Sequence, residues 1–466
     1  MKTIYALTLI SIALTINACT NAQGGAEGAN TDTQSNTAQF AIPDLPAREF
    51  VVGSQTEADQ LRDRSERLKT KLTTDPNDIK SLLALSEVFI TEARITGNYA
   101  ANHDAALDIV DHVLQLTKEK TKDAKAMDQR GEALTLKAVI RLSQHQFQEA
   151  LDLGKAAVAI DPHRAFNYGV LVDANVELGN YAEAVAMSDK MVGTRPDLRS
   201  YSRVSYLREI HGDVPGAIQA MEMAIKAGYP GAEETSWCRV QLGGIHERNG
   251  DLKMADEQYA AALAERADYP FALAAAGRVA GKMKNYTKAE TFLQEAIKRM
   301  PDAHFHADLA RVYRVQGKEA EAVEEIRITE ETLIGLSGKQ HGATHSDHGH
   351  SHEVGLEMAR FELEFHKDLP NALANAEHEF EHREYNIEVN SALAAILYAQ
   401  GNLSEAQVHL DLAKKTGSKN ADLLLIEGLI KTAKGDKAAG KKLVKEAFQR
   451  DPYLQHPLAV AGHSVV

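Results

Sequence analysis

The chain has 466 residues, of which 44% are hydrophobic and 25% charged, so it has enough apolar material for a sizeable folded core. Its formal net charge is −14 at pH 7. This acidic balance argues against nucleic acids and anionic lipid surfaces as general partners. The only two cysteines are Cys19 and Cys238, which excludes an intramolecular disulfide framework, and Cys238 is predicted to be a structural thiol.

Residues 1–18 have the pattern of an export signal, because Lys2 precedes an apolar run too short to span a bilayer comfortably. The run ends in INAC at residues 16–19, which resembles the lipobox of bacterial lipoproteins, although Asn17 departs from the usual small or apolar residue. The resemblance implies cleavage, acylation of Cys19 by groups such as palmitate, and membrane anchoring. An ordinary secretory signal with an incidental cysteine is the alternative.

Residues 19–49 are predicted to be a flexible tether, since they are rich in Gly, Asn, Thr and Gln and offer few large apolar side chains to bury. In similar lipoproteins an Asp after the acylated Cys favours the inner membrane. Thr20 at that position therefore indicates the outer membrane and leaves the periplasmic or surface face open. Residues 50–76 are predicted to form a leading helix that ends before Pro76 and caps the helical array after it.

Residues 77–452 repeat with a period of about 34 residues. Within this range, residues 236–270 superimpose on the next unit, so that Ala255 corresponds to Ala289. Each unit has a stretch of helical spacing, a break such as Gly250-Asp251, and a second helix with small residues on one face, which lets two helices approach closely. The small residue of each second helix recurs at Ala106, Ala150, Ala184, Ala217, Ala255, Ala289, Ala322, Ala372, Ala406 and Gly440.

This pattern resembles the tetratricopeptide repeat, which has a Leu-Gly pair, spaced alanines and a closing proline. Closing prolines stand at Pro162, Pro196, Pro301 and Pro452. The resemblance implies an all-α, right-handed superhelical solenoid of about ten helix hairpins without a sheet. Each hairpin is expected to pack only on its neighbours. The tail, residues 453–466, carries no clear signal.

A His-rich insertion, residues 338–352, lies within the longest step between repeats. Imidazoles at alternate positions in a flexible loop can bind Zn²⁺, Ni²⁺ or Cu²⁺, but no rigid spacing fixes a coordination geometry. A metal-handling lipoprotein is therefore the alternative function, and a solvated loop with adventitious affinity is the plainer interpretation. The candidate ligands are His341, His345, His348, His350 and His352.

Residues 378–382 read HEFEH and fit the H-E-x-x-H pattern of zinc peptidases, in which two His on one helix face bind zinc and the Glu acts as base. The match falls within a repeat, with no third ligand in evidence, so a chance match is the preferred interpretation. Phosphate-binding Gly-rich loops and nucleophile motifs such as G-x-S-x-G are absent. The protein is therefore not predicted to be an enzyme, and no cofactor is predicted apart from the metals above.

In tetratricopeptide arrays the first helices line a concave groove that binds partner peptides. Carried over to this chain, that arrangement predicts partner-binding positions at Tyr206, Trp237, Phe271, Arg278, Lys282, Arg311, Arg314 and Tyr398. A row of Arg with aromatic anchors suits an acidic segment, because Arg binds carboxylates bidentately. Packing between repeats and a solvated charged face are the alternative. The leading hypothesis is a membrane-anchored scaffold that binds another envelope protein or an acidic peptide, and not nucleic acid.

Overall fold

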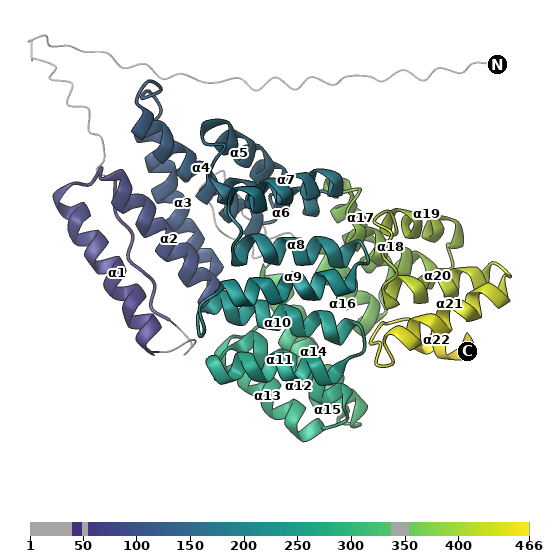
Figure 1. Ribbon diagram of the computed structural model, residues 1–466. Coiled ribbons are helices and arrows are strands. Elements are labelled where there is room, and N and C mark those ends of the chain that lie inside the picture. The colour runs from purple at the N-terminus through teal and green to yellow at the C-terminus, as the bar shows by residue number, and fades with distance from the viewer. Residues whose placement is uncertain (1–39, 49–54, 337–353, 466) are drawn as a thin grey trace, which may run out of the picture. The chain divides into compact units, whose positions relative to one another are not determined.

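The computed structural model describes residues 40–48, 55–336 and 354–465. These residues contain α-helices, one short π-helix and no strand, as the all-α prediction requires (Figure 1). Residues 42–466 form one compact unit. Within the described ranges, no helix combines the length and the apolar character needed to cross a bilayer. The predicted signal, Cys19 and most of the predicted tether lie outside the described residues.

Ten helix hairpins make up most of this unit, which agrees with the number predicted from the period. The first helices of the hairpins are α2 (Ile79–Thr96), α4 (Ala124–Ser143), α6 (Ala165–Glu177), α8 (Leu198–Ile210), α10 (Glu233–Arg248), α12 (Pro270–Lys282), α14 (Ala303–Val315), α16 (Gly355–Phe361) with the π-helix η1 (Glu362–His366), α18 (Ile387–Ala399) and α20 (Ala421–Ala433). The second helices are α3 (Tyr99–Leu116), α5 (Phe147–Ile160), α7 (Tyr181–Thr194), α9 (Val214–Ala227), α11 (Leu252–Glu265), α13 (Tyr286–Arg299), α15 (Glu319–Leu336), α17 (Leu369–His382), α19 (Leu403–Ala413) and α21 (Lys437–Arg450).

Small residues allow the two helices of each hairpin to approach closely. All nine of the alanines predicted for this role are fully buried. At the tenth position, a Cβ on Gly440 would lie 2.6 Å from the carbonyl oxygen of Gly428, so even alanine would not fit without a shift. The backbones of α20 and α21 therefore approach more closely there than a pair of alanines allows, and the repeat phase read from the sequence is confirmed.

Every hairpin turn contains one residue in the left-handed conformation, which closes the first helix and redirects the chain into the second. Seven of these ten residues are glycines, which adopt a positive φ without steric cost. The residues are Gly97, His145, Gly179, Gly212, Gly250, Lys284, Gly317, Lys367, Gly401 and Gly435. The repeated turn signals in the sequence thus reflect one backbone requirement that recurs ten times.

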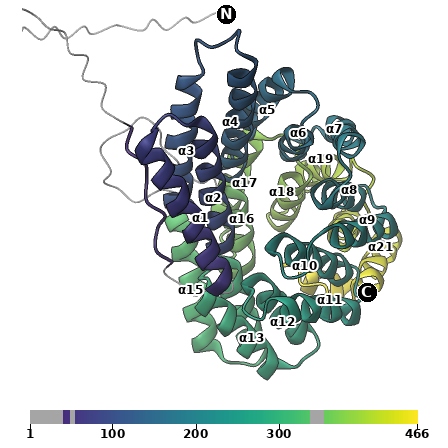
Figure 2. The same cartoon turned by 60° about the vertical axis from the view of Figure 1, so that its left-hand side comes forward.

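The first helices lie on the inner side of the superhelix. First helices of neighbouring hairpins contact one another directly, as α10 does with α8 and α12, whereas no comparable contact joins the second helices of neighbouring hairpins among the described elements. A stack that is denser on one side must curve towards that side. The concave surface is therefore lined by first helices, which is the arrangement expected for a binding groove (Figure 2).

The superhelix also contacts itself after one turn, along a line that we call the seam. The Tyr181 hydroxyl accepts a hydrogen bond of 2.9 Å from the amide of Ile387, which is 206 residues further along the chain. Nearby, Arg383 forms an ion pair of 2.7 Å with Glu177. The seam joins hairpin turns to the joints between later hairpins, at Gly97 and Met300, Gly179 and Tyr385, Gly212 and Gly417, and Gly250 and Pro452.

The expectation that each hairpin packs only on its neighbours is therefore wrong for this chain. Each of these four contacts joins a turn to the end of the hairpin five places further on, because the curvature accumulated over those hairpins brings the two together (Figures 1 and 2). Interactions across the seam add a non-local term to a stability that would otherwise be a sum of neighbouring contacts.

Helices cap both ends of the stack. At the start, α1 (Gln55–Thr74) packs on α2, and its bounds are close to those predicted for the leading helix, residues 50–76. Arg48, which precedes α1, forms a bidentate ion pair with the buried Glu92, at 2.6 and 2.8 Å. At the end, α22 (Ala459–Val465) packs on α20 and α21. The tail thus contains a helix for which the sequence showed no signal.

Candidate binding groove

A ladder of alternating charges runs along the inner face from α10 to η1. Arg278 on α12 donates to Glu247 on α10 at 2.8 and 2.9 Å and to Asp308 on α14 at 3.2 Å. Arg311 donates to the same Asp308 at 2.6 Å and to Glu364 on η1 at 2.7 Å. We call these five residues the charge ladder. It ties three neighbouring first helices and the π-helix together by their side chains.

The ladder is buried and electrostatically strong at its α10 end. Burial alone would raise the pKa of Glu247, but Arg278 and Lys282 outweigh that effect and lower the pKa to about 2. Lys282 contributes an ion pair of 3.1 Å, and the hydroxyl of Tyr259 donates to the same carboxylate at 2.9 Å. Glu247 is therefore ionised over the whole physiological range and holds two cations in fixed positions.

The arginines predicted to bind a partner thus already have partners within the chain. Sequence phase placed Arg278, Lys282 and Arg311 on the inner face, where the structure also places them. Their charges, however, are offset by Glu247, Asp308 and Glu364. Arg314 differs, because it forms no ion pair with any described residue and lies over the ring of Phe365 at 4.9 Å.

The aromatic residues predicted for the groove fall into two groups. Tyr206 and Trp237 are the more exposed, at 42% and 39%. Phe271 is partly buried between two rings, 5.5 Å from that of Tyr269 and 5.9 Å from that of Phe305, so it packs α12 against α14. Tyr398 is also partly buried and packs on the hydrophobic core of the last hairpins.

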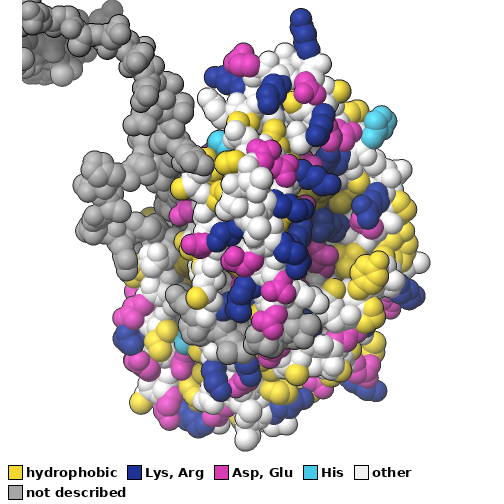
Figure 3. Space-filling view, turned by 90° about the vertical axis from the view of Figure 1, so that its left-hand side faces the viewer, with side chains coloured by type: hydrophobic (Ala, Val, Ile, Leu, Met, Phe, Trp, Pro, Cys, Tyr) yellow, Lys and Arg dark blue, Asp and Glu magenta, His cyan; other side chains and the backbone are white. Residues whose placement is uncertain are grey.

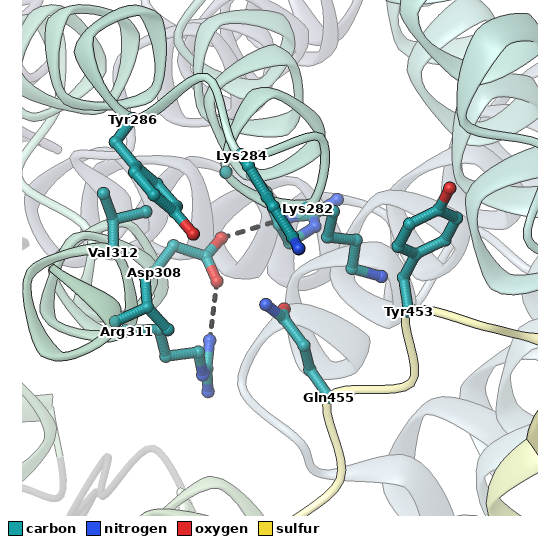
Figure 4. A pocket seen from close by; sticks show the side chains of 11 residues that line it. Lys282, Lys284, Tyr286, Asp308, Arg311, Val312, Tyr453 and Gln455 are labelled. Atoms are coloured by element: carbon teal, nitrogen blue, oxygen red, sulfur yellow. Dashed lines mark hydrogen bonds and ion pairs between the residues drawn. The ribbon is translucent and has the colours of Figure 1, made fainter.

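A pocket of about 180 Å³ opens beside the ladder, between α12, α14 and the tail (Figure 4). Besides ladder residues it is lined by Lys282, Lys284, Tyr286, Tyr453 and Gln455. Figure 4 shows Lys282, Lys284 and Gln455 extending towards one another from α12, the following turn and the tail, while the hydroxyl of Tyr453 points away from them. Lys284 occupies the left-handed turn position and has no ion-pair partner among the described residues.

Sequence reasoning missed Lys284, Tyr286, Tyr453 and Gln455. The tail residues could not be placed because their position depends on where the last hairpin ends in space. Around a hollow in one face, Figure 3 shows Lys and Arg side chains gathered among Asp and Glu side chains. The face in this view is thus mixed in charge.

The H-E-x-x-H residues do not form a peptidase centre. Glu379 is buried and forms an ion pair of 2.8 Å with Arg383, so its carboxylate is directed into the packing of the hairpin. The imidazole rings of His378 and His382 contact each other edge to face, 5.1 Å apart. A buried carboxylate that is engaged by an arginine is poorly suited to act as the base of a zinc site, which favours the interpretation as a chance match.

Two other predicted sites have different outcomes. The five histidines of the insertion, His341, His345, His348, His350 and His352, lie outside the described residues. Cys238 is fully buried on α10, and burial raises the pKa of its thiol to about 12. Such a thiol is mostly protonated at neutral pH, which is consistent with the predicted structural role.

Comparisons with known proteins give only distant structural likenesses. No protein-family model and no curated protein matches the chain. Among solved structures, a tetratricopeptide repeat protein from Parabacteroides merdae is 16% identical, with a TM-score of 0.32 over 57% of this chain and 98% of that one. The TPR protein TTC0263 of Thermus thermophilus is 23% identical, with a TM-score of 0.33 over 40% of this chain and 91% of that one. Pseudomonas aeruginosa pilF is 16% identical, with a TM-score of 0.38 over 45% of this chain and 94% of that one.

Likenesses this weak add nothing to the argument from the hairpins. The ten hairpins, their common phase of about 34 residues and the first helices on the inner face identify the fold without them. The chain is a helical solenoid of the tetratricopeptide type.

Proposed function

We propose that this protein is a membrane-anchored scaffold of the bacterial cell envelope whose inner face binds an acidic segment of another protein. The observation that carries the proposal is the pocket beside the charge ladder, where Lys284 lacks a carboxylate partner among the described residues. Arg314, further along α14, lacks one as well. The lipobox-like sequence before Cys19 supports the anchor, and Thr20 supports the outer membrane.

The ladder makes the pocket a preorganised site for a carboxylate. Arg278, Lys282 and Arg311 each form an ion pair with an acidic residue of the chain, which favours one orientation of these side chains beside the pocket. A carboxylate of the partner would be bound by Lys284 and by the side-chain amide of Gln455, which line the same pocket. Exposed cations of this kind give salt-sensitive recognition of moderate affinity.

Charge reversal at the two unpaired cations tests this function. Replacing Lys284 and Arg314 together with Glu is expected to weaken binding of a fluorescent Glu-rich peptide by at least about tenfold, since each carboxylate then meets a like charge. Capture of a partner from solubilised envelope membranes should fall in parallel. Fluorescence anisotropy at two salt concentrations measures the first effect and affinity purification the second.

The matched control is the double replacement of Lys253 and Lys298 with Glu, which changes the net charge equally on exposed second-helix positions. This variant should bind the peptide as the unmodified protein does. Equal loss in both double variants would show that only net charge matters, and unchanged binding in the first would place the partner elsewhere.

The anchor has a separate test. Cys19→Ala is expected to abolish acylation, so the protein should leave the membrane fraction and incorporate no labelled palmitate, because no acyl chain remains to insert. Cell fractionation and metabolic labelling measure the two effects. A Cys19→Ala protein that stays in the membrane and is still labelled would contradict the lipoprotein assignment while leaving the groove unaffected.

A further inference from the structure

One buried glutamate differs from all the others in the described part of the chain. Four buried glutamates each form an ion pair with an arginine: Glu92 with Arg48, Glu233 with Arg94, Glu247 with Arg278, and Glu379 with Arg383. Such compensation is expected, because an unpaired buried carboxylate is costly.

The exception is Glu362, the first residue of η1. It is 7% exposed and has neither a Lys nor an Arg partner among the described residues. Its contact is with the Nδ1 atom of His366, at 3.1 Å, one turn further along the same π-helix. On the other side of that imidazole, Nε2 lies 3.8 Å from a carboxylate oxygen of Glu330 on α15. Two carboxylates therefore face one imidazole, and no Lys or Arg of the described residues forms an ion pair with either of them.

We propose that Glu330, Glu362 and His366 bind a divalent transition-metal ion, with Zn²⁺ as the ion that suits them best. One ligand atom from each of the three residues lies within 4.8 Å of the other two. Two ligand atoms of a tetrahedral Zn²⁺ site lie about 3.3–3.6 Å apart, given bonds of about 2.0–2.2 Å. One ion takes a single nitrogen of His366, so the side chains would have to rotate to bring both carboxylates to that nitrogen. Imidazole with carboxylates suits Zn²⁺, whereas Ca²⁺ and Mg²⁺ prefer oxygen ligands alone.

The position of the site gives the metal a structural consequence. Glu330 belongs to the second helix of the seventh hairpin, and Glu362 and His366 to the first helix of the eighth. These hairpins are the two that the predicted His-rich insertion separates. An ion held by all three residues would fix the joint between them and neutralise the buried carboxylate in the same step.

Calorimetric titration with Zn²⁺ tests the site in the full mature chain, expressed without a polyhistidine tag. To remove competing imidazoles, His341, His345, His348, His350 and His352 are first replaced with Gln. This background should still bind one Zn²⁺ per chain. Adding Glu330→Gln or His366→Gln should weaken that binding at least about tenfold, as loss of a ligand requires. Zn²⁺ should also raise the melting temperature of the background but not of these variants.

The control is His378→Gln in the same background, because His378 is an exposed imidazole 4.0 Å from Glu381 without a buried carboxylate. It should leave the affinity for Zn²⁺ unchanged. Glu330→Gln keeps the test informative if the other variants fold poorly, since the Glu330 side chain is 35% exposed. No saturable Zn²⁺ binding, or equal affinity in the background and in both variants, would overturn the proposal.

Discussion

Replacing Arg278 with Met is expected to lower the free energy of unfolding by about 3 kcal/mol, because the carboxylates that Arg278 compensates would then lose a buried positive charge. Arg278 bonds both Glu247 and Asp308, which are 3% and 5% exposed. The loss should fall at the low end of the usual range of about 3–5 kcal/mol, because Lys282 and Tyr259 still contact Glu247 and Arg311 still contacts Asp308. Urea denaturation followed by circular dichroism measures it, with fluorescence of Trp237, the only tryptophan, as a second probe.

The pH dependence of this loss identifies its cause. The pKa of Glu247 is about 2 in the folded protein and about 4.3 for an unperturbed glutamate. Its ionised form therefore stabilises the native state above pH ~4.3, and that contribution disappears as the pH falls towards 2. The difference between the unmodified protein and Arg278→Met should narrow over the same interval. A constant difference would mean that lost packing, and not lost charge, explains the effect.

The control for Arg278 is Arg327→Met on α15, where both partners of the arginine are exposed. Its effect should stay within about 0.5 kcal/mol, as for other surface ion pairs. An equally large loss at Arg327 would show that arginines matter here for a reason other than the ladder. The ladder also means that replacing Arg278, Arg311 and Arg314 together would test stability as much as binding, so Lys284 and Arg314 are the better targets for a binding test.

Gly179→Ala is expected to destabilise the protein by roughly 2–5 kcal/mol through two effects that act together. Gly179 has a φ of 77°, where an L-residue is strained by about 1–2 kcal/mol. The added Cβ would also collide with the carbonyl group of Tyr385 and lie 2.8 Å from the amide nitrogen of Asn386, across the seam. Overpacking of this kind costs about 1–3 kcal/mol more.

Gly401→Ala separates the two effects, because Gly401 has a similar φ of 83° but no atom within 4 Å of the point that an added Cβ would occupy. Only the strain should appear there. The difference in melting temperature between the two variants then measures the seam contact alone. Equal destabilisation by both substitutions would indicate that the seam contributes nothing to stability.

The hairpins could be predicted because their determinants are local. Ala255 and its equivalents must be small, and turn residues such as Gly250 must be left-handed, whatever the rest of the chain does. The seam could not be predicted in this way. In the sequence Gly179 and Gly401 look alike, and only the curvature accumulated over five hairpins brings Tyr385 against the first of them and nothing against the second.

The groove was predicted in part, for a related reason. Helical phase placed Arg278 and Arg311 on the inner face but gave no account of their partners. A signal for these partners does exist in the sequence: Glu247 and Arg278 are 31 residues apart, and Arg278 and Asp308 are 30 apart. Asp173 and Arg203 repeat the spacing of 30 and also form an ion pair. Opposite charges just under one period apart therefore predict ladder partners between neighbouring first helices.

The seam limits how much the shape of the groove can vary before a ligand binds. An open solenoid is elastic, since its pitch changes when small rotations at the joints add up, and a ligand must then select one pitch from many. Here Tyr181, Arg383 and Lys415 bond across successive superhelical turns, and such bonds oppose a change of pitch. A partner entering the groove would find it already in its binding geometry, so little conformational entropy is lost on association. A substitution that breaks seam contacts should therefore weaken binding of a partner in the groove, even though no groove residue has changed.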